Sequence, residues 1–303
     1  MKKYIKIMRI DHWIKQLFIL PGFICALYLG KFPFKAEYLI LLVVGLFATS
    51  LIASANYVIN EYLDREFDRF HPIKKKRVLV SEDVNGVVIW ILWFILGGLG
   101  LFIGYKVLGM NFFMMEIFLL FMGIVYNVNP ARTKDVFLLD VLSESLNNAI
   151  RLLLGWFILP INIVIPASMV LGYWMSGAFL MAIKRYAEYL MISDKTQASL
   201  YRKSFKYYTD KSLLTTAFFY AMTSIFFLGI FLIKYRIELV LFIPFLIGLY
   251  CYYFYMSFDK DSAVQKPEKL YKERGLMAYL LFLIMLFIIL MNVNIEWLNI
   301  FLI

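Results

Sequence analysis

Three polar residues at the end of an apolar segment have the spacing of one helix face. Asn60, Asp64 and Asp68 lie at positions i, i+4 and i+8, directly after the apolar segment 37–60. If the helix continues, their side chains share one face. Like charges one turn apart repel each other, but two carboxylates can hold a divalent cation between them. Because the chain has only two histidines, the pattern favours a hard, oxygen-bound metal such as Mg²⁺.

Basic residues follow this face directly. The pair His71-Pro72 is expected to end the helix, and Lys74 and Arg77 come next on a loop. Ammonium and guanidinium groups bind phosphate oxygens, so these side chains are candidates for phosphate binding. A charged helix end without a binding role is the alternative. The polar stripe begins at Asn56, inside the apolar segment, where a polar group is costly, and this favours a functional site.

A second polar stripe lies in the segment 137–159. Its members are Asp140, Glu144, Asn147, Asn148 and Arg151. They recur at helical spacing in an apolar background, and ionisable groups inside a membrane are usually functional and face other helices. An ion pair of Arg151 with Glu144 or Asp140 that only fixes packing is the alternative. Arg132 and Lys134 precede the stripe and are further candidates for phosphate binding.

The composition predicts membrane-spanning helices as the elements that carry these motifs. Of the 303 residues, 62% are hydrophobic and only 17% are charged, and the mean hydropathy is +0.75. A soluble globule could not cover so much apolar surface, and a disordered chain would have more charges. Since a span needs about 20 apolar residues, nine spans are predicted. They are 16–33, 37–60, 86–107, 111–127, 137–159, 162–183, 212–233, 237–256 and 276–294.

The charges predict the orientation of these spans. Most of the 31 lysines and arginines fall at the N-terminus or in the loops after spans two, four, six and eight. The opposite side holds Lys31, Lys35, Lys106, Lys234 and Arg236. The positive-inside rule therefore places the N-terminus in the cytoplasm. Most carboxylates lie on the same side as these cations. The net charge of +10 therefore indicates binding of a phosphorylated substrate with a divalent cation rather than binding of nucleic acid.

These two acidic segments resemble the motifs of the UbiA superfamily of intramembrane prenyltransferases. The first motif of that superfamily, N-D-x-x-D-x-x-x-D, is matched by Asn60, Glu61, Asp64 and Asp68, with Glu61 in place of the first Asp. The second is matched by Tyr126, Lys134 and Asp140, with Glu144 one turn further. The resemblance implies one all-α domain over residues 1–303, a nine-helix bundle. It also implies that Asp64, Asp68 and Asp140 bind Mg²⁺ and that both motifs hold the substrate diphosphate.

Other segments resemble the decaprenyl-phosphate phosphoribosyltransferase branch of this superfamily. They are HPIKKKR (71–77), IKRYAEY (183–189), YRKSFKYYT (201–209) and KPEKLYKERGL (266–276), and Arg151 matches an arginine of the branch. The implied reaction transfers phosphoribose from phosphoribosyl pyrophosphate to a polyprenyl phosphate and releases pyrophosphate. Lys134, Arg151, Lys184 and Arg185 would bind the 5-phosphate and the lipid phosphate, and Glu188 completes the K-R-x-x-E element.

Two other functions stay open. A prenyltransferase would transfer the prenyl group of a polyprenyl diphosphate to an aromatic or other small acceptor, and an aromatic content of 18% is compatible with a shielded allylic cation. An ion-coupled transporter would use the intramembrane charges as a path. The carboxylates lie at predicted cytoplasmic helix ends, which favours an enzyme acting on a lipid at the cytoplasmic face of the cell membrane.

Overall fold

The computed structural model describes residues 2–33, 35–77, 80, 84–192, 194–259, 264 and 267–298, and the regular elements in these ranges are helices. The prediction of an all-α protein is confirmed. The chain divides into two units, Met1–Val164 with Ile192–Tyr208 and Ile165–Met191 with Thr209–Ile303. The single domain over residues 1–303 stays a prediction. Lys266, the first residue of the segment KPEKLYKERGL, lies outside the described residues.

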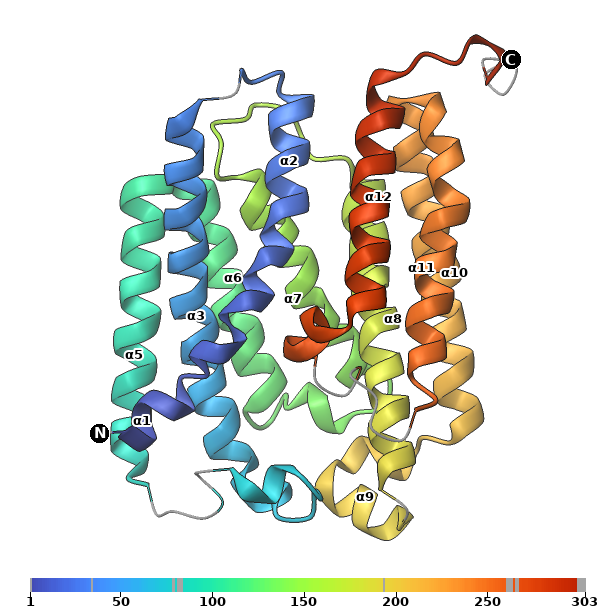
Figure 1. Cartoon of the computed structure of the whole chain (residues 1–303). Coiled ribbons are helices and arrows are strands. Elements are labelled where there is room, and N and C mark those ends of the chain that lie inside the picture. The colour runs from blue at the N-terminus through green and yellow to red at the C-terminus, as the bar shows by residue number, and fades with distance from the viewer. Residues whose placement is uncertain are drawn as a thin grey trace. The chain divides into compact units, whose positions relative to one another are not determined.

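The first unit contains most of the predicted motif residues. Figure 1 labels its helices. Its main helices are α1 (Lys2–Ile7), α2 (Leu20–Leu29), α3 (Ala36–Asp68), α5 (Gly86–Ile103), α6 (Met110–Asn127), α7 (Leu139–Trp156) and α9 (Lys195–Tyr201). Its 3₁₀-helices are η1 (Ile10–Ile19), η2 (Lys74–Lys76), η4 (Thr133–Asp135) and η5 (Lys203–Lys206), and η3 (Gly104–Leu108) is a π-helix.

The second unit consists of α8 (Ala167–Met191), α10 (Asp210–Tyr235), α11 (Ile243–Met256) and α12 (Arg274–Asn292), with the 3₁₀-helices η6 (Ile237–Phe242) and η8 (Pro267–Lys272). A capping box in which Thr209 and Ser212 bond each other's backbone begins α10. The hydroxyls of Ser176, Ser224 and Tyr250 lie within 2.5–2.8 Å of one another and connect α8, α10 and α11. Such polar contacts stabilise helix pairs in a lipid environment.

Eight of the described helices are long and apolar enough to cross a membrane. The predicted span 137–159 corresponds to α7, which is not among the eight because its 18 residues include Asp140, Glu144 and Arg151. The count of nine spans and the cytoplasmic N-terminus therefore stay predictions. The helix bounds differ from two predicted spans. The predicted span 16–33 is divided between η1 and α2, and α8 begins after Pro166 and continues to Met191 rather than ending at 183.

Helix α3 carries the first polar face beyond the apolar segment, as predicted. Its 33 residues span about 50 Å, and the hydrocarbon layer is only about 30 Å thick. The helix ends at Asp68. In the following turn, His71 Nδ1 accepts the backbone N–H groups of Ile73 and Lys74, both at 3.1 Å. This turn leads the basic residues of 74–77 back toward the end of α3.

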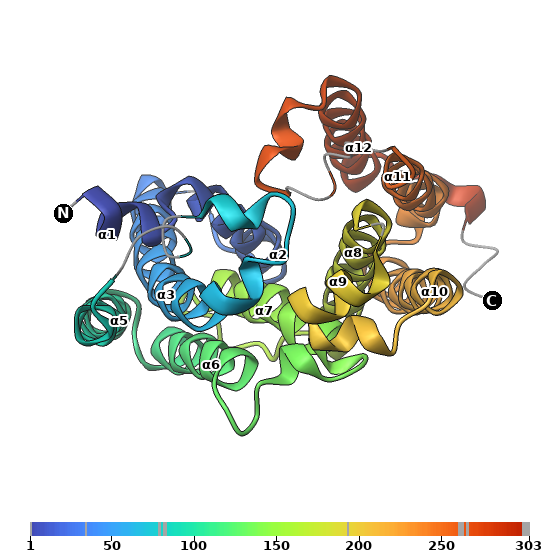
Figure 2. The ribbon, with the colours of Figure 1, turned by 90° about the horizontal axis from the view of Figure 1, so that it is seen from below.

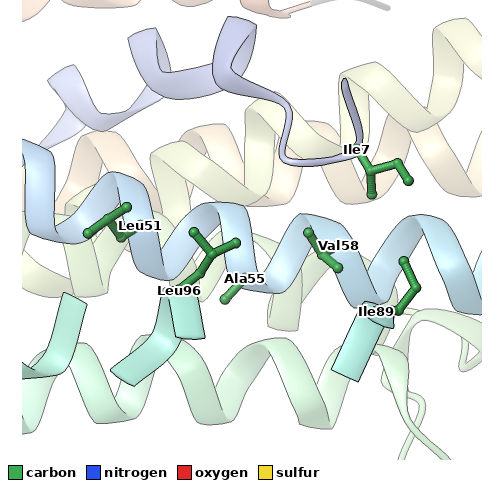
Figure 3. Close-up of a cluster of buried hydrophobic side chains, with 6 residues drawn as sticks. All are labelled: Ile7, Leu51, Ala55, Val58, Ile89 and Leu96. Atoms are coloured by element: carbon green, nitrogen blue, oxygen red, sulfur yellow. The ribbon is translucent and has the colours of Figure 1, made fainter. Parts of the chain in front are cut away.

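The opposite face of α3 packs in an apolar core. Figure 3 shows this core, which contains Ile7 of α1, Leu51, Ala55 and Val58 of α3, and Ile89 and Leu96 of α5. Seen nearly end-on in Figure 2, α3, α5 and α6 lie side by side. By helical periodicity, Leu51, Ala55 and Val58 lie opposite the stripe of Asn60 and Asp64. Burial of this face therefore fixes the direction in which the polar stripe points.

Two glycines bring η1 and α2 close to α7. A Cβ atom on Gly22 would lie 1.9 Å from the carbonyl oxygen of Leu152, and one on Gly155 would lie 2.0 Å from that of Ile19. Neither space admits a side chain, so the backbones approach as closely as at other small-residue helix contacts in membranes. The contact places the polar residues of η1 against the second polar stripe.

Candidate functional site

Asp64 is the centre of the first polar cluster. Its Oδ1 atom accepts Lys134 Nζ at 2.5 Å and Arg132 Nη2 at 3.0 Å, and its Oδ2 atom accepts Asn60 Nδ2 at 3.3 Å. Its side chain is 18% exposed. The structure thus brings together four predicted residues from α3 and the loop before α7.

Asn127, which the sequence analysis did not select, connects this cluster. Its side-chain oxygen accepts Asn60 Nδ2 at 2.5 Å and Lys134 Nζ at 2.8 Å, and its backbone oxygen accepts Arg132 Nη1 at 2.9 Å. Asn127 is the last residue of α6 and is buried. The end of α6 therefore holds both cations in front of Asp64.

The loop that presents Arg132 and Lys134 has unusual backbone geometry. Arg132 has a φ of +24° and Leu138 a φ of +65°, in the region that disfavours side chains with a Cβ atom. Arg132 is fixed by Asp135 at 3.0 Å and covers the ring of Phe67 at 4.8 Å. Burial lowers the pKa of Lys134 to about 8, although the Asp64 carboxylate acts in the opposite direction.

Asp68 and Glu61 are held by a different pair of cations. Arg77 Nη1 lies 2.7 Å from Asp68 Oδ2, and its Nε atom lies 3.7 Å from Glu61 Oε1. Glu61 also accepts Arg9 Nη1 at 2.8 Å. Although burial acts to lower it, the carboxylates of Asp68 and Glu61 raise the pKa of Arg77 overall. Glu61, the residue that departs from the superfamily motif, thus bridges two arginines.

Lys74 lies beside an aromatic group of the 201–208 segment. Its ammonium group bonds the hydroxyl of Tyr201 and lies 4.7 Å from the centre of that ring. The ring of His71 contacts Tyr201 edge-on at 4.5 Å. The predicted phosphate-binding lysine is therefore positioned by a cation–π contact with a residue more than 120 positions further along the chain.

Asp140 has very different surroundings from Asp64. It is completely buried at the start of α7, where Tyr208 donates a hydrogen bond of 2.7 Å to Oδ1 and Ser204 one of 3.1 Å to Oδ2. Arg202 lies 3.6 Å from Oδ2. The Tyr208 oxygen also accepts the backbone N–H of Leu138 at 3.1 Å, and so stabilises the residue with positive φ. Each carboxylate oxygen of Asp140 thus already accepts a hydroxyl group.

Glu144 and Arg151 of the second stripe connect α7 to two other elements. Glu144 accepts the hydroxyl of Tyr126 at 2.8 Å, and Arg202 lies 3.4 Å from the same hydroxyl. Arg151 donates from Nε to Gln16 of η1 at 2.8 Å and from Nη1 to the backbone oxygen of Asn147 at 3.1 Å. The stripe thus joins α6, η1 and the 201–208 segment to α7.

Lys184, Arg185 and Glu188 belong to the second unit. The end of the predicted span at 183 puts them on a loop, but α8 continues through all three. Arg185 Nη1 and Glu188 Oε2 form a buried ion pair of 3.3 Å, one helical turn apart. Their roles in phosphate binding stay predictions.

The chemistry of the α3 carboxylates fits Mg²⁺. Among the described residues, no group of three or more His, Cys, Asp and Glu side chains has the geometry of a metal site. Mg²⁺ commonly takes only one or two protein carboxylates and completes its shell with water and substrate phosphate. Asp64 and Asp68, one turn apart, are suited to that use. In this structure the surrounding cations neutralise both carboxylates. When Mg²⁺ and a substrate phosphate bind, Mg²⁺ would take the place of these cations at the carboxylates, and the cations would bind the phosphate.

Several contributing residues were missed because their partners are remote in sequence. They are Arg9, Gln16, Asn127, Tyr201, Arg202, Ser204 and Tyr208. Arg9 was assigned only to membrane topology, and residues 201–208 were placed in a segment that resembles the branch without individual roles. The signal that could have selected Asn127 is its place directly after Tyr126, a residue of the second motif.

Comparisons with known proteins show the family of this chain. The model of the UbiA prenyltransferase family matches residues 18–282. The nodulation protein NoeC of Azorhizobium caulinodans is 26% identical over 210 residues, which are 67% of this chain and 62% of NoeC. Decaprenyl-phosphate phosphoribosyltransferase of Mycobacterium tuberculosis is 28% identical over 209 residues, 69% of this chain and 67% of the relative.

Solved structures share the fold. A UbiA homologue from Archaeoglobus fulgidus bound to GPP and Mg²⁺ has a TM-score of 0.68 at 18% identity, over 93% of this chain and 99% of that one. The same homologue bound to DMAPP and Mg²⁺ has a TM-score of 0.67 at 17% identity, over 96% and 100%. With most of its length matched by the family model and with eight apolar helices, this chain is an integral membrane protein that belongs to the UbiA prenyltransferase family.

Proposed function

We propose that this protein transfers phosphoribose from phosphoribosyl pyrophosphate to a polyprenyl phosphate, with release of pyrophosphate, at the cytoplasmic face of the cell membrane. The observation that carries the proposal is the excess of cations in the first unit. Arg132 and Lys134 hold Asp64, while Arg77 and Arg9 hold Asp68 and Glu61. A reaction between two phosphorylated substrates needs more positive charge than one with a single diphosphate. The mycobacterial relative, 28% identical, is named for this activity.

Asp64 and Asp68 would hold Mg²⁺. Asp140, the third predicted ligand, accepts the hydroxyls of Tyr208 and Ser204 and would instead anchor the loop before α7. When bound, the metal ion would supply charge stabilisation to the diphosphate. Arg132 and Lys134 lie within 3.0 Å of Asp64, so they would contact the same diphosphate once its oxygens replace the carboxylate as acceptors. Asn60 would orient Asp64 through its hydrogen bond. These donors would stabilise the negative charge that develops as pyrophosphate leaves.

The proposed bond changes need no general base. The bond between ribose C1 and the pyrophosphate oxygen breaks, and its electron pair leaves with pyrophosphate. A new bond forms between C1 and an oxygen of the polyprenyl phosphate. A phosphate monoester is already anionic at neutral pH, since its second pKa is about 6. Lys74, Arg151, Lys184 and Arg185 are the further candidates for binding the 5-phosphate and the lipid phosphate.

Prenyl transfer from a polyprenyl diphosphate to an aromatic or other small acceptor is the second candidate. It is supported by the fold, because the Archaeoglobus fulgidus homologue was solved with GPP and with DMAPP. In this reaction the lipid itself carries the diphosphate at the α3 carboxylates. Tyr126 and Glu144, which share a hydrogen bond of 2.8 Å, would then lie next to the acceptor.

The test uses the purified full chain in detergent with Mg²⁺. One reaction contains labelled phosphoribosyl pyrophosphate and decaprenyl phosphate, and the other contains a polyprenyl diphosphate and an aromatic acceptor. We expect a labelled lipid product only in the first, and its loss in EDTA. Product in the second reaction alone would overturn the proposal in favour of prenyl transfer. Full activity in EDTA would contradict the metal role of Asp64 and Asp68.

A further inference from the structure

The side-chain amide of Asn127, at the end of α6, has one possible orientation. Its Nδ2 atom donates to the backbone oxygen of Gly123 at 2.8 Å, and its Oδ1 atom accepts Lys134 Nζ at 2.8 Å. A carbonyl oxygen only accepts and an ammonium group only donates, so exchanging the two ends of the amide would break both contacts. The amide oxygen of this buried residue is therefore fixed toward Lys134.

This oxygen closes a ring of hydrogen bonds with Asp64. It accepts Asn60 Nδ2 at 2.5 Å as well as Lys134 Nζ. The same two nitrogens reach the carboxylate, because Asn60 Nδ2 lies 3.3 Å from Asp64 Oδ2 and Lys134 Nζ lies 2.5 Å from Asp64 Oδ1. Asn60 and Lys134 thus each bond both Asp64 and Asn127. The two bonds to Asn127 do not depend on the carboxylate, so they can persist when the partners of Asp64 change.

A change of partners leaves Lys134 in need of another acceptor. In the proposed site, Lys134 gives up Asp64 when the carboxylate takes a metal ion. The side chain of Lys134 is buried, and a buried ammonium group without an acceptor is costly. Asn127 Oδ1 remains within hydrogen-bond distance. Because the amide carries no net charge, it holds the lysine more weakly than a carboxylate would and leaves its positive charge available to a phosphate.

The backbone of Asn127 has a similar relation to Arg132. The three nitrogens of this guanidinium group each have a different acceptor. Nη1 donates to the backbone oxygen of Asn127 at 2.9 Å, Nε donates to Asp135 at 3.0 Å, and Nη2 donates to Asp64 at 3.0 Å. Two of these bonds do not involve Asp64. Arg132 can therefore turn one donor group to a phosphate while the other two keep it in place.

A second asparagine holds the end of α6 against α3. Asn56 donates from Nδ2 to the backbone oxygen of Leu119 at 2.9 Å. A Cβ atom on Gly123 would lie 2.0 Å from Asn56 Oδ1, so Asn56 occupies the space that the glycine leaves open. Gly123 thus admits Asn56 beside its α-carbon and accepts Asn127 at its carbonyl oxygen. This packing fixes the place of Asn127 without help from the cations.

We infer that Asn127 is a positioning residue of the proposed reaction, which holds Lys134 beside the substrate diphosphate after Asp64 has released the lysine. Asn127 acts through Lys134 and does not itself bind the substrate. The inference rests on the proposed function only for the presence of a diphosphate at Asp64, and both candidate reactions have one there.

The test separates this role from a contribution to folding with two variants. Asn127→Ala removes both side-chain bonds. Asn127→Ser removes the acceptor of Lys134, but a helical serine hydroxyl can donate to the carbonyl oxygen four residues earlier, as Ser50 does to Leu46 at 2.6 Å. The dissociation constant of pyrophosphate is measured with Mg²⁺, without turnover, on the full chain in detergent. We expect both variants to weaken binding about tenfold, in line with loss of a hydrogen bond to a charged group. The control Asn111→Ala, at an exposed position of the same helix, should change binding less than about twofold.

A double-mutant cycle with Lys134→Met shows whether Asn127 acts through the lysine. In the Lys134→Met protein, Asn127→Ser should change pyrophosphate binding less than about twofold, because the cation that Asn127 holds is absent. Tenfold losses in both backgrounds would overturn the inference, and so would normal binding by Asn127→Ser. Thermal unfolding reports the folded state, and an Asn127→Ser protein that does not fold would also overturn the inference, since the residue would then be structural. A protein that shows the coupling but transfers no phosphoribose would refute the proposed function alone.

Discussion

Asp64 and Asp140 were both predicted to bind Mg²⁺, but their shortest contacts in the structure differ: cations for Asp64, hydroxyl groups for Asp140, with Arg202 further away at 3.6 Å. Asp64 is partly exposed and is neutralised by the flexible side chains of Lys134 and Arg132. Asp140 is completely buried and accepts the hydroxyls of Tyr208 and Ser204. A carboxylate held by cations can exchange them for a metal ion and its phosphate. A carboxylate bonded by hydroxyls from another segment has the contacts of a structural anchor.

The largest effect is expected for Asp64→Asn. The amide cannot balance the charge of Mg²⁺, so kcat/KM should fall by a factor of about 1000 or more, with the fold retained. Labelled product formation and Mg²⁺ binding measure this. Glu66→Gln is the matched control on the same helix, because the Glu66 side chain is 59% exposed and forms ion pairs with the neighbouring Arg65 and Arg69. An Asp64→Asn protein with normal Mg²⁺ affinity would contradict the metal role.

Asp140→Asn should act on stability first. The amide has one acceptor oxygen instead of two and loses the negative charge beside Arg202, at a cost of about 1–3 kcal/mol in the free energy of unfolding. Thermal unfolding in detergent measures this loss. The residual activity should keep its dependence on Mg²⁺ concentration. A large increase in the Mg²⁺ concentration required for half-maximal activity would show that Asp140 is a metal ligand after all, and would remove the distinction from Asp64.

The difference between the two aspartates shows where sequence reasoning succeeded. The spacing of Asn60, Asp64 and Asp68 predicted that α3 continues as a helix with one polar face, because this pattern depends only on helical periodicity. The spacing of Asp140, Glu144 and Arg151 predicted the polar stripe of α7 for the same reason. Local periodicity thus determined which residues share a face.

Contacts between remote segments were not predictable in the same way. The partners of Asp140 come from residues 204 and 208, and the cations of Asp64 depend on positive φ angles at Arg132 and Leu138. The end of α8 was placed at 183 because charges follow, but the Arg185–Glu188 pair satisfies them within the helix. The start of α2 at Leu20 was not predicted either, because the apolar segment 16–33 does not show that its first residues belong to the 3₁₀-helix η1.

Tyr208→Phe should reproduce part of the Asp140 effect. It removes the donor to Asp140 and the acceptor for the backbone N–H of Leu138, so we expect a loss of about 1 kcal/mol. The neighbouring change Tyr207→Phe is the control, since Tyr207 is 62% exposed. Thermal unfolding of the two variants compares them directly. Equal stability would mean that the hydroxyl does not anchor the loop before α7.

Glu116 extends the comparison to a carboxyl group without either kind of partner. It is completely buried in α6, and neither oxygen has a hydrogen-bond partner among the described residues. Its Oε2 atom lies where a side chain on Gly104 of the π-helix would be. Glu116→Met replaces the carboxyl group by an unbranched apolar chain and should raise the free energy of unfolding by about 1 kcal/mol, with unchanged activity. Glu116→Gln keeps two polar atoms in the same place and should not stabilise. If Glu116→Met instead lowered both stability and turnover, a buried carboxyl group with neither cations nor hydroxyls beside it would also be functional. The kind of partner would then no longer distinguish functional from structural carboxyl groups in this protein.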